Sequence, residues 1–126
     1  MSAGAALQAA AVAALQGIAE LGGVHDGQPV QAAVPYALVE AGPEADWGHK
    51  SAAGRELRLA VTIRDEGERP VRLRRLMAEC ETALAGIAAI DGWQVVTMRF
   101  LASRTAKDRQ GGWAGLVEFR ARLLAL

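Results

Sequence analysis

Two stretches of the chain alternate between hydrophobic and polar or small residues, and this pattern predicts a sheet. In the first stretch every second residue from 57 to 63 is a large apolar one. The second stretch runs from 117 to 123 with the same period. The apolar positions are Leu57, Leu59, Val61, Ile63, Val117, Phe119, Ala121 and Leu123. A period of two predicts strands that bury one face and leave the other in contact with water.

Two other stretches have the helical period. Residues 2–21 are rich in alanine, with Ser2 in position to cap a helix and Gly22-Gly23 beyond its expected end. A second helix is predicted to begin at Pro70, a residue that suits a first helical turn. Its apolar stripe consists of Leu73, Leu76, Met77, Cys80, Leu84 and Ile87. Both stripes need a broad apolar partner, which a sheet supplies.

The remaining segments predict two more strands and two polar connections. Residues 36–40 and 93–102 are expected to be strands, whereas residues 41–54 are expected to form a loop. Residues 103–112 are polar and close with glycine, which predicts a long hairpin between the last two strands. The order is α-β-β-α-β-β. We expect one domain over residues 1–126, an α+β two-layer sandwich with a mainly antiparallel four-stranded sheet and both helices on one face.

Charge and cysteine content narrow the possible functions. The 126 residues carry 14 Lys plus Arg and 14 Asp plus Glu, so no net charge draws the chain to nucleic acid or membrane. The single cysteine, Cys80, excludes an intramolecular disulfide and is predicted to be buried on its helix. No apolar run approaches the ~20 residues that span a bilayer. The N-terminus lacks a positively charged leader, and we expect a cytoplasmic protein.

The sequence contains no convincing catalytic motif. No nucleophile has a plausible base nearby, and the glycines form no phosphate-binding pattern. His25 and His49 lie 24 residues apart in loop-like sequence, which favours structural roles. We therefore predict no catalytic, metal or cofactor-binding residues, and no cofactor. One alternative stays open, a small ligand-binding or enzymatic α+β domain built on the His25-Asp26 and Asp46-His49 loops.

Several segments, taken in order, carry a family resemblance over nearly the whole chain. They are "GGVHDGQPV" and "PYALVE", then Asp46-Trp47 with Lys50, then "GRELRLAVTI", and finally "GWQVVTMRFLASRTAKDRQGGWAGLVEFRARL". This succession resembles the family of small phage-type tail completion proteins, which occur in tailed phages, prophages and gene transfer agents.

The resemblance implies a structural particle protein and not an enzyme. It implies a tail terminator, a ring that is commonly hexameric and sits on the head-proximal end of the tail tube. Such a ring stops tube growth and joins tail to head while DNA passes through its lumen. The implied partners are further copies of the chain, the tail tube protein and a head–tail connector or neck protein, with DNA only in transit and no membrane. The chain would reside in the host cytoplasm during assembly and then in the neck of the particle.

Two alternatives within the same particle remain, a tube subunit and a head–tail connector. For any of these roles, seven residues in the two polar connections are the candidates for subunit and tube contacts. They are Asp46, Trp47, Lys50, Arg104, Lys107, Asp108 and Arg109. Trp47 has two interpretations: a lid on the domain's own core, or an anchor that is buried only in the assembled ring, since tryptophan and arginine dominate interface hot spots.

Overall fold

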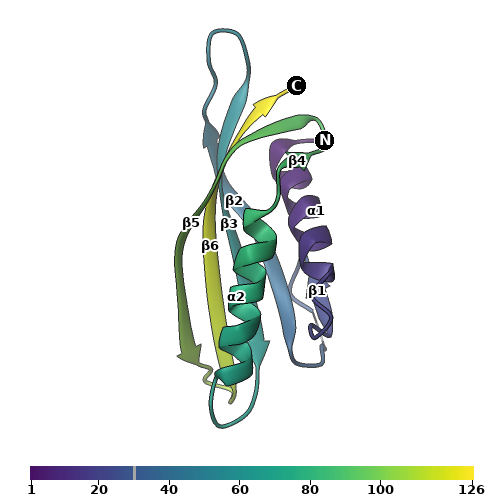
Figure 1. Cartoon of the computed structure of the whole chain (residues 1–126), viewed down its shortest axis with the longest axis vertical. Helices are drawn as coiled ribbons and strands as arrows, with labels where there is room; N and C mark the ends of the chain where they lie inside the picture. Colours follow the sequence, from purple (N-terminus) through teal and green to yellow (C-terminus); the bar gives the residue numbers. More distant parts are fainter. Residues whose placement is uncertain (30) are drawn as a thin grey trace.

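The fold places two helices against one face of a long, twisted sheet (Figure 1). A computed structural model describes residues 1–29 and 31–126. The elements are α1 (Ala3–Gln16), β1 (Gly23–His25), β2 (Tyr36–Asp46), β3 (Gly54–Asp65), α2 (Val71–Ala85), β4 (Ala89–Ile90), β5 (Trp93–Lys107) and β6 (Trp113–Ala125).

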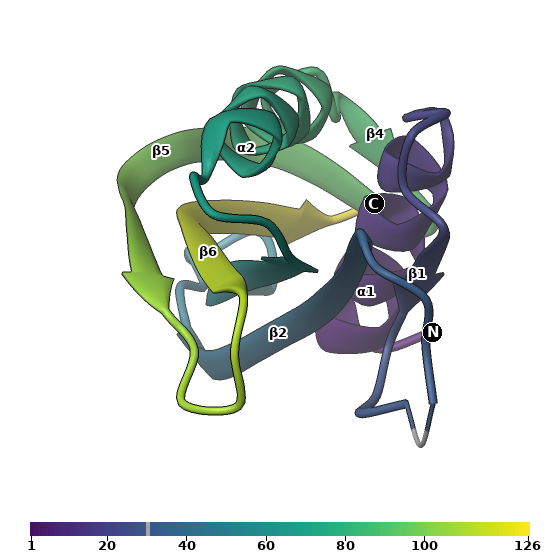
Figure 2. The ribbon, with the colours of Figure 1, turned by 90° about the horizontal axis from the view of Figure 1, so that it is seen from below.

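The sheet corrects the expected fold class. Within the described residues it has six strands in the order β1-β2-β3-β6-β5-β4. The β1–β2 pair is parallel and the other pairs are antiparallel, so the sheet is mixed. It curls into a half-barrel, as the end-on view in Figure 2 shows. The prediction of a four-stranded antiparallel sheet in a flat two-layer sandwich, in the order α-β-β-α-β-β, was therefore wrong.

The two missed strands are too short to show a period. β1 has three residues, which pair with Tyr36–Leu38, and β4 has two, which pair with the start of β5. A two-residue repeat cannot be recognised in segments of that length. Both strands lie at the outer edges of the sheet and widen it, and β1 adds its parallel pair.

Half of each of the two predicted polar connections is strand. β2 continues through Gly42-Pro43 to Asp46, and β5 continues to Lys107. The pairing of β2 with β3 shifts between Ala41 and Glu44, so a bulge accommodates the glycine and proline that had predicted a break. Two further irregularities interrupt β5. Bulges bend a strand and increase its twist, which contributes to the curl of the sheet.

Helix α1 begins as predicted and ends earlier. Ser2 caps it, since its side-chain oxygen accepts a hydrogen bond from the Ala5 N–H at 3.1 Å. The helix ends at Gln16, before Gly17, because glycine is a poor residue for helix continuation. Ile18 and Leu21 still pack against the core from outside the helix.

The core lies between the helices and the inner face of the sheet. The predicted alternation is confirmed, because the odd-numbered residues 57–63 and 117–123 are all buried. The apolar stripe of α2 is buried against them through Leu84, and Phe119 is 1% exposed with its ring 5.8 Å from that of Phe100. Burying one such side chain contributes about 1.5–3 kcal/mol. The alanines of α1 allow that helix to approach the sheet closely.

The outer face of the sheet carries a row of arginines that the linear sequence does not reveal. Arg58 on β3 lies opposite Arg120 on β6, which in turn lies opposite Arg99 on β5. In the described chain none of the three forms an ion pair, and the Nε atom of Arg120 is buried without a hydrogen-bond partner. Like charges directly opposite one another destabilise a sheet.

The two edges of the sheet are unlike. On the β2 side, β1 covers the first residues and Gln8 of α1 covers the next ones. The Gln8 side chain donates to the Val39 carbonyl at 2.7 Å and accepts from the Ala41 N–H at 2.8 Å. These two backbone groups thus have the hydrogen bonds that a neighbouring strand would otherwise supply. On the other side, β4 pairs only with Trp93 and Gln94. The rest of the β5 edge has no strand partner among the described residues.

Candidate interaction surfaces

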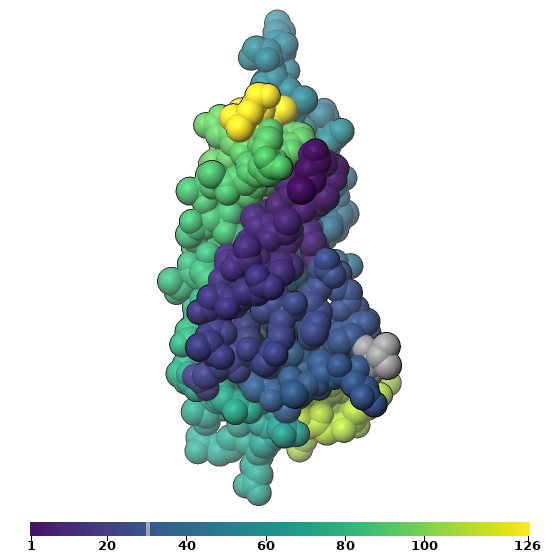
Figure 3. Space-filling view, turned by 90° about the vertical axis from the view of Figure 1, so that its right-hand side faces the viewer, coloured from purple at the N-terminus to yellow at the C-terminus, as the bar shows by residue number. Residues whose placement is uncertain are grey.

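The residues around Trp47 form an arm that projects beyond the helices. The arm comprises residues 42–54, which are the end of β2, a turn and the start of β3 (Figures 1 and 3). The Trp47 N–H donates to the Gly54 carbonyl at 2.9 Å, and the His49 N–H donates to the Ala52 carbonyl at 2.8 Å. The segment that was expected to be an irregular loop is thus an ordered hairpin. Lys50 is exposed at its tip.

The Trp47 side chain is half-buried by polar neighbours. Its ring lies 4.8 Å from the His49 ring in an edge-to-face arrangement, and the guanidinium carbon of Arg122 lies 5.4 Å from its centroid. Arg122 also donates to Glu56 at 2.8 Å. Trp47 is not among the half-buried apolar residues that pack against the core, which include Trp93 and Trp113. The arm therefore meets the body of the protein through a cation–π contact at its base.

Acidic and basic side chains brace this arm. Arg55 forms ion pairs with Glu44 at 3.2 Å and with Asp46 at 3.8 Å. Asp46 also accepts a hydrogen bond from the Gly48 N–H at 3.3 Å, which supports the turn. Gly54 is required by close approach, since a Cβ there would lie 2.3 Å from the Trp47 carbonyl oxygen.

The second candidate group lies at the other end of the sheet. Arg104 and Lys107 belong to β5, and the turn that follows contains Asp108 and Arg109. Asp108 organises this turn: it forms an ion pair with Arg64 and accepts from the Gln110 N–H at 3.2 Å. The three cations are exposed. The predicted ten-residue tip is thus a short turn on a long hairpin.

The two groups of predicted contact residues do not meet within one chain. Asp46 pairs with Arg55 near the C-terminal end of β6, whereas Lys107 pairs with Trp113 at the beginning of β6. The arm and the β5–β6 turn therefore lie at opposite ends of the long axis (Figure 1). Any contact between the two groups requires two copies of the chain.

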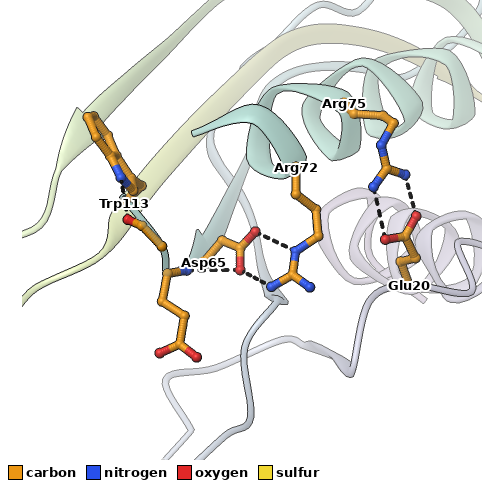
Figure 4. Close-up of polar contacts among 7 residues, drawn as sticks. Glu20, Asp65, Arg72, Arg75 and Trp113 are labelled. Atoms are coloured by element: carbon orange, nitrogen blue, oxygen red, sulfur yellow. Dashed lines mark hydrogen bonds and ion pairs between the residues drawn. The ribbon is translucent and has the colours of Figure 1, made fainter. Parts of the chain in front are cut away.

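Two ion pairs at the start of α2 were not predicted (Figure 4). The Asp65 side chain, 2% exposed, accepts from the Arg72 Nε at 2.8 Å, from a second Arg72 nitrogen and from the Glu66 N–H at 2.9 Å. The hydrogen bonds from Arg72 lower the pKa of Asp65 and outweigh the opposing effect of burial. One turn later Arg75 binds Glu20 and lowers its pKa in the same way. These pairs tie the helix to the β3 end and to the segment after α1.

The same end of the molecule includes an indole hydrogen bond. Trp113 donates from its Nε1 to the Gly67 carbonyl at 3.1 Å, which fixes the loop between β3 and α2 (Figure 4). A broad depression nearby is lined by polar side chains, including Arg64, Asp65 and Asp108. Arg64 pairs with Asp108 and Asp65 pairs with Arg72, so these three side chains are held by ion pairs within the chain.

The groups that could support chemistry are dispersed. His25 lies in β1 beside the start of β2, whereas His49 follows the far end of β2. Cys80 is buried as predicted, and burial raises the pKa of its thiol to about 12. Across residues 1–29 and 31–126, no three His, Cys, Asp or Glu side chains are grouped to hold a metal ion. No helix in the described part of the chain is long and apolar enough to cross a membrane.

Comparisons with known proteins give the class of this protein. No curated protein matches the sequence. A chain from the virion of a native gene transfer agent particle is similar in structure, with a TM-score of 0.73 and 25% sequence identity over 99% of this chain and 100% of that one. Residues 4–124 match the family model described as tail completion protein gp17. The family and the structural match make this protein a structural protein of the phage-tail type.

The match covers nearly the whole chain. The chain belongs to the tail completion protein gp17 family. The surface features that its fold offers for contacts are an arm, an open sheet edge and a face that carries arginines.

Proposed function

We propose that the protein is a tail terminator: a ring, most simply a hexamer, that caps the head-proximal end of the tail tube and joins tail to head. DNA passes through the lumen of the ring. The protein acts without catalysis, cofactor or metal. It assembles in the host cytoplasm and remains in the neck of the particle. The observation that carries the proposal is the family match over residues 4–124, together with the full-length similarity to a chain of a gene transfer agent virion.

The shape of the molecule supports a closed assembly. A ring forms when a surface on one subunit binds a different surface on the next and the rotation closes. This chain has unlike sheet edges and two candidate contact groups at opposite ends. A ring of identical subunits binds a tube at several equivalent points, so modest affinity for each subunit gives a stable cap.

The experiment is to purify the protein and image it by negative-stain electron microscopy, with mass photometry to count subunits. We expect rings of one size that bind to one end of purified tail tubes. Tails assembled without the protein should lack length control and fail to join heads. Long tubes formed by the protein alone would identify a tube subunit instead. A compact monomer that binds neither tubes nor heads would refute the terminator assignment.

A further inference from the structure

The two strands nearest the sheet edges carry opposite charges. β2 contains Glu40, Glu44 and Asp46, with no Lys or Arg in its sequence. β5 contains only cations among its charged residues, namely Arg99, Arg104 and Lys107. Although the chain has no net charge, each of these two strands, which are not neighbours in the sheet, carries charges of a single sign.

The cations of β5 lack partners within the chain. Among the described residues, Arg99, Arg104 and Lys107 form no ion pair. Helix α2 places Arg74 and Glu81 beside Arg104, and their opposite charges cancel. The positive charge along this edge is therefore available to another molecule.

The β5 edge also exposes backbone and apolar groups. Beyond Gln94, its outer N–H and C=O groups face no strand in the described structure. Val96 is 44% exposed and Phe100 is 38% exposed, and both belong to this strand. A long exposed edge with apolar side chains is a site for pairing with another strand, and proteins blunt such edges with cations and bulges. Here the cations repel a second β5, whereas they attract an acidic strand.

The acidic strand is open only where it leaves the body of the protein. β1 covers Tyr36–Leu38, and the Gln8 amide satisfies Val39 and Ala41. From residue 42 onward, the edge of β2 belongs to the arm and has no strand partner in the described structure, although the Glu44 side chain lies beside Gly4 of α1. The tip of the arm projects from the body of the protein (Figure 3). Of its acids, Glu44 and Asp46 contact Arg55, while Glu40 is exposed and forms no ion pair in the described chain.

We propose that the open edge of β5 binds the acidic arm of a second copy of this chain, with the exposed Glu40 beside that arm, so that successive subunits join head to tail. This inference rests on the proposed ring and specifies the surfaces that build it. The second copy is the occupant because both complementary surfaces occur on the same chain, as a head-to-tail contact requires. Charge attraction selects the partner and orientation, and main-chain hydrogen bonds add affinity.

The test uses two charge-reversal variants. The β5 variant is R99E/R104E, which changes two exposed cations without ion pairs. The β2 variant is E40K/D46K, which leaves the contact between Glu44 and Arg55 in place. A control variant, R69E, reverses one exposed cation in the loop between β3 and α2, outside both edge strands. Circular dichroism and thermal unfolding check that each variant folds.

Assembly is then measured by mass photometry, first for each variant alone and then for an equimolar mixture. We expect wild type and control to form rings, and each edge variant alone to associate at least about tenfold more weakly, because like charges then face each other. The mixture should restore rings with alternating subunits, because each reversed edge meets a complementary one. Restoration also shows that both variants are folded.

The outcomes separate the two proposals. The ring itself is refuted if the wild-type chain stays monomeric at high concentration and forms no ring on the ends of purified tubes. Wild-type rings that either edge variant leaves unchanged refute the edge pairing and leave the ring in place. The pairing is also refuted if the two edge variants are folded but fail to assemble when they are mixed. In that case the substitutions have disrupted some contact other than the one between the β5 edge and the acidic arm.

Discussion

The pair between Asp65 and Arg72 should be the most stability-sensitive polar contact at the base of the molecule. Substitution Asp65→Asn keeps the shape of the side chain but removes its charge and replaces one acceptor oxygen with an NH2 group. That group faces the Arg72 guanidinium, which is itself a donor, so at least one of the two hydrogen bonds from Arg72 is lost.

The size of the effect follows from burial. A hydrogen bond to a charged group contributes about 1.5–3 kcal/mol, and Asp65 is almost fully buried. Arg72 is 44% exposed on its side chain and can turn to water, which places the loss near the lower part of that range. We expect the free energy of unfolding to fall by about 2 kcal/mol at pH 7. At about 4 °C per kcal/mol for a domain of this size, Tm should fall by about 8 °C.

The pH dependence gives a second, independent signature. The folded-state pKa of Asp65 is lowered, so its contribution to stability is present above the unfolded pKa of about 3.9. It is lost as the pH falls through the folded-state pKa. Wild type should therefore begin to lose its advantage over Asp65→Asn below about pH 4, where the carboxylate of the unfolded chain starts to be protonated, and should lose it fully below the folded-state pKa.

The assay is urea unfolding followed by tryptophan fluorescence, at neutral pH and at several acidic values. Glu20→Gln is the matched control, because it makes the same chemical change in an exposed pair with Arg75 and should alter Tm little. Equal effects of the two substitutions would refute the role of burial. A difference between wild type and Asp65→Asn that stays constant down to the acid unfolding transition would refute the assigned electrostatic cause.

Four further substitutions test separate features of the fold. Trp47→Ala should cost about 1 kcal/mol or less in urea unfolding, because it removes one half-buried cation–π contact, yet it should abolish rings in mass photometry. A large loss of monomer stability would support the lid interpretation instead. Gly54→Ala should open the arm, seen as faster amide hydrogen exchange there with an intact core, because its Cβ meets a backbone oxygen. Gln8→Ala should lower unfolding free energy by about 1–2 kcal/mol by leaving two edge groups of β2 unsatisfied, and an unchanged urea midpoint would contradict this. Arg120→Thr should stabilise the chain by about 0.5 kcal/mol in low salt and less in high salt, and an effect independent of salt would argue against charge repulsion.

Residue patterns predicted those parts of the fold that repeat over several residues. The apolar positions from Leu57 to Ile63 are buried as expected, and Cys80 lies on the buried stripe of α2. The pattern failed where structure depends on distant partners. A bulge carries β2 through Gly42-Pro43, and β1 exists only because β2 pairs with it. Local composition predicts a turn at Gly42-Pro43, and it gives no indication of the strand β1.

For the candidate contact residues, too, the sequence shows what depends on local composition and does not show what depends on distant partners. Composition singled out Trp47 and the cations near Arg104 as unusual for polar connections, and their roles remain predictions. It could not show that they lie at opposite ends of the sheet, or that Arg99 stands in a row with Arg58 and Arg120, because strand register brings those residues together. Nothing in the sequence distinguishes Asp65 from the other acids of the chain, because its partner Arg72 is brought beside it by the position of α2.

The difference between the two sheet edges has a consequence for the symmetry of any assembly that uses both. When an open β5 edge binds an acidic β2 edge, every subunit must point the same way, and no two-fold axis relates neighbouring subunits. The ring then has two chemically different rims, one carrying the arms around Trp47 and the other carrying the β5–β6 turns around Asp108. A single kind of chain can in this way present one surface to a tail tube and another to a head, which makes the joint directional without a second gene product.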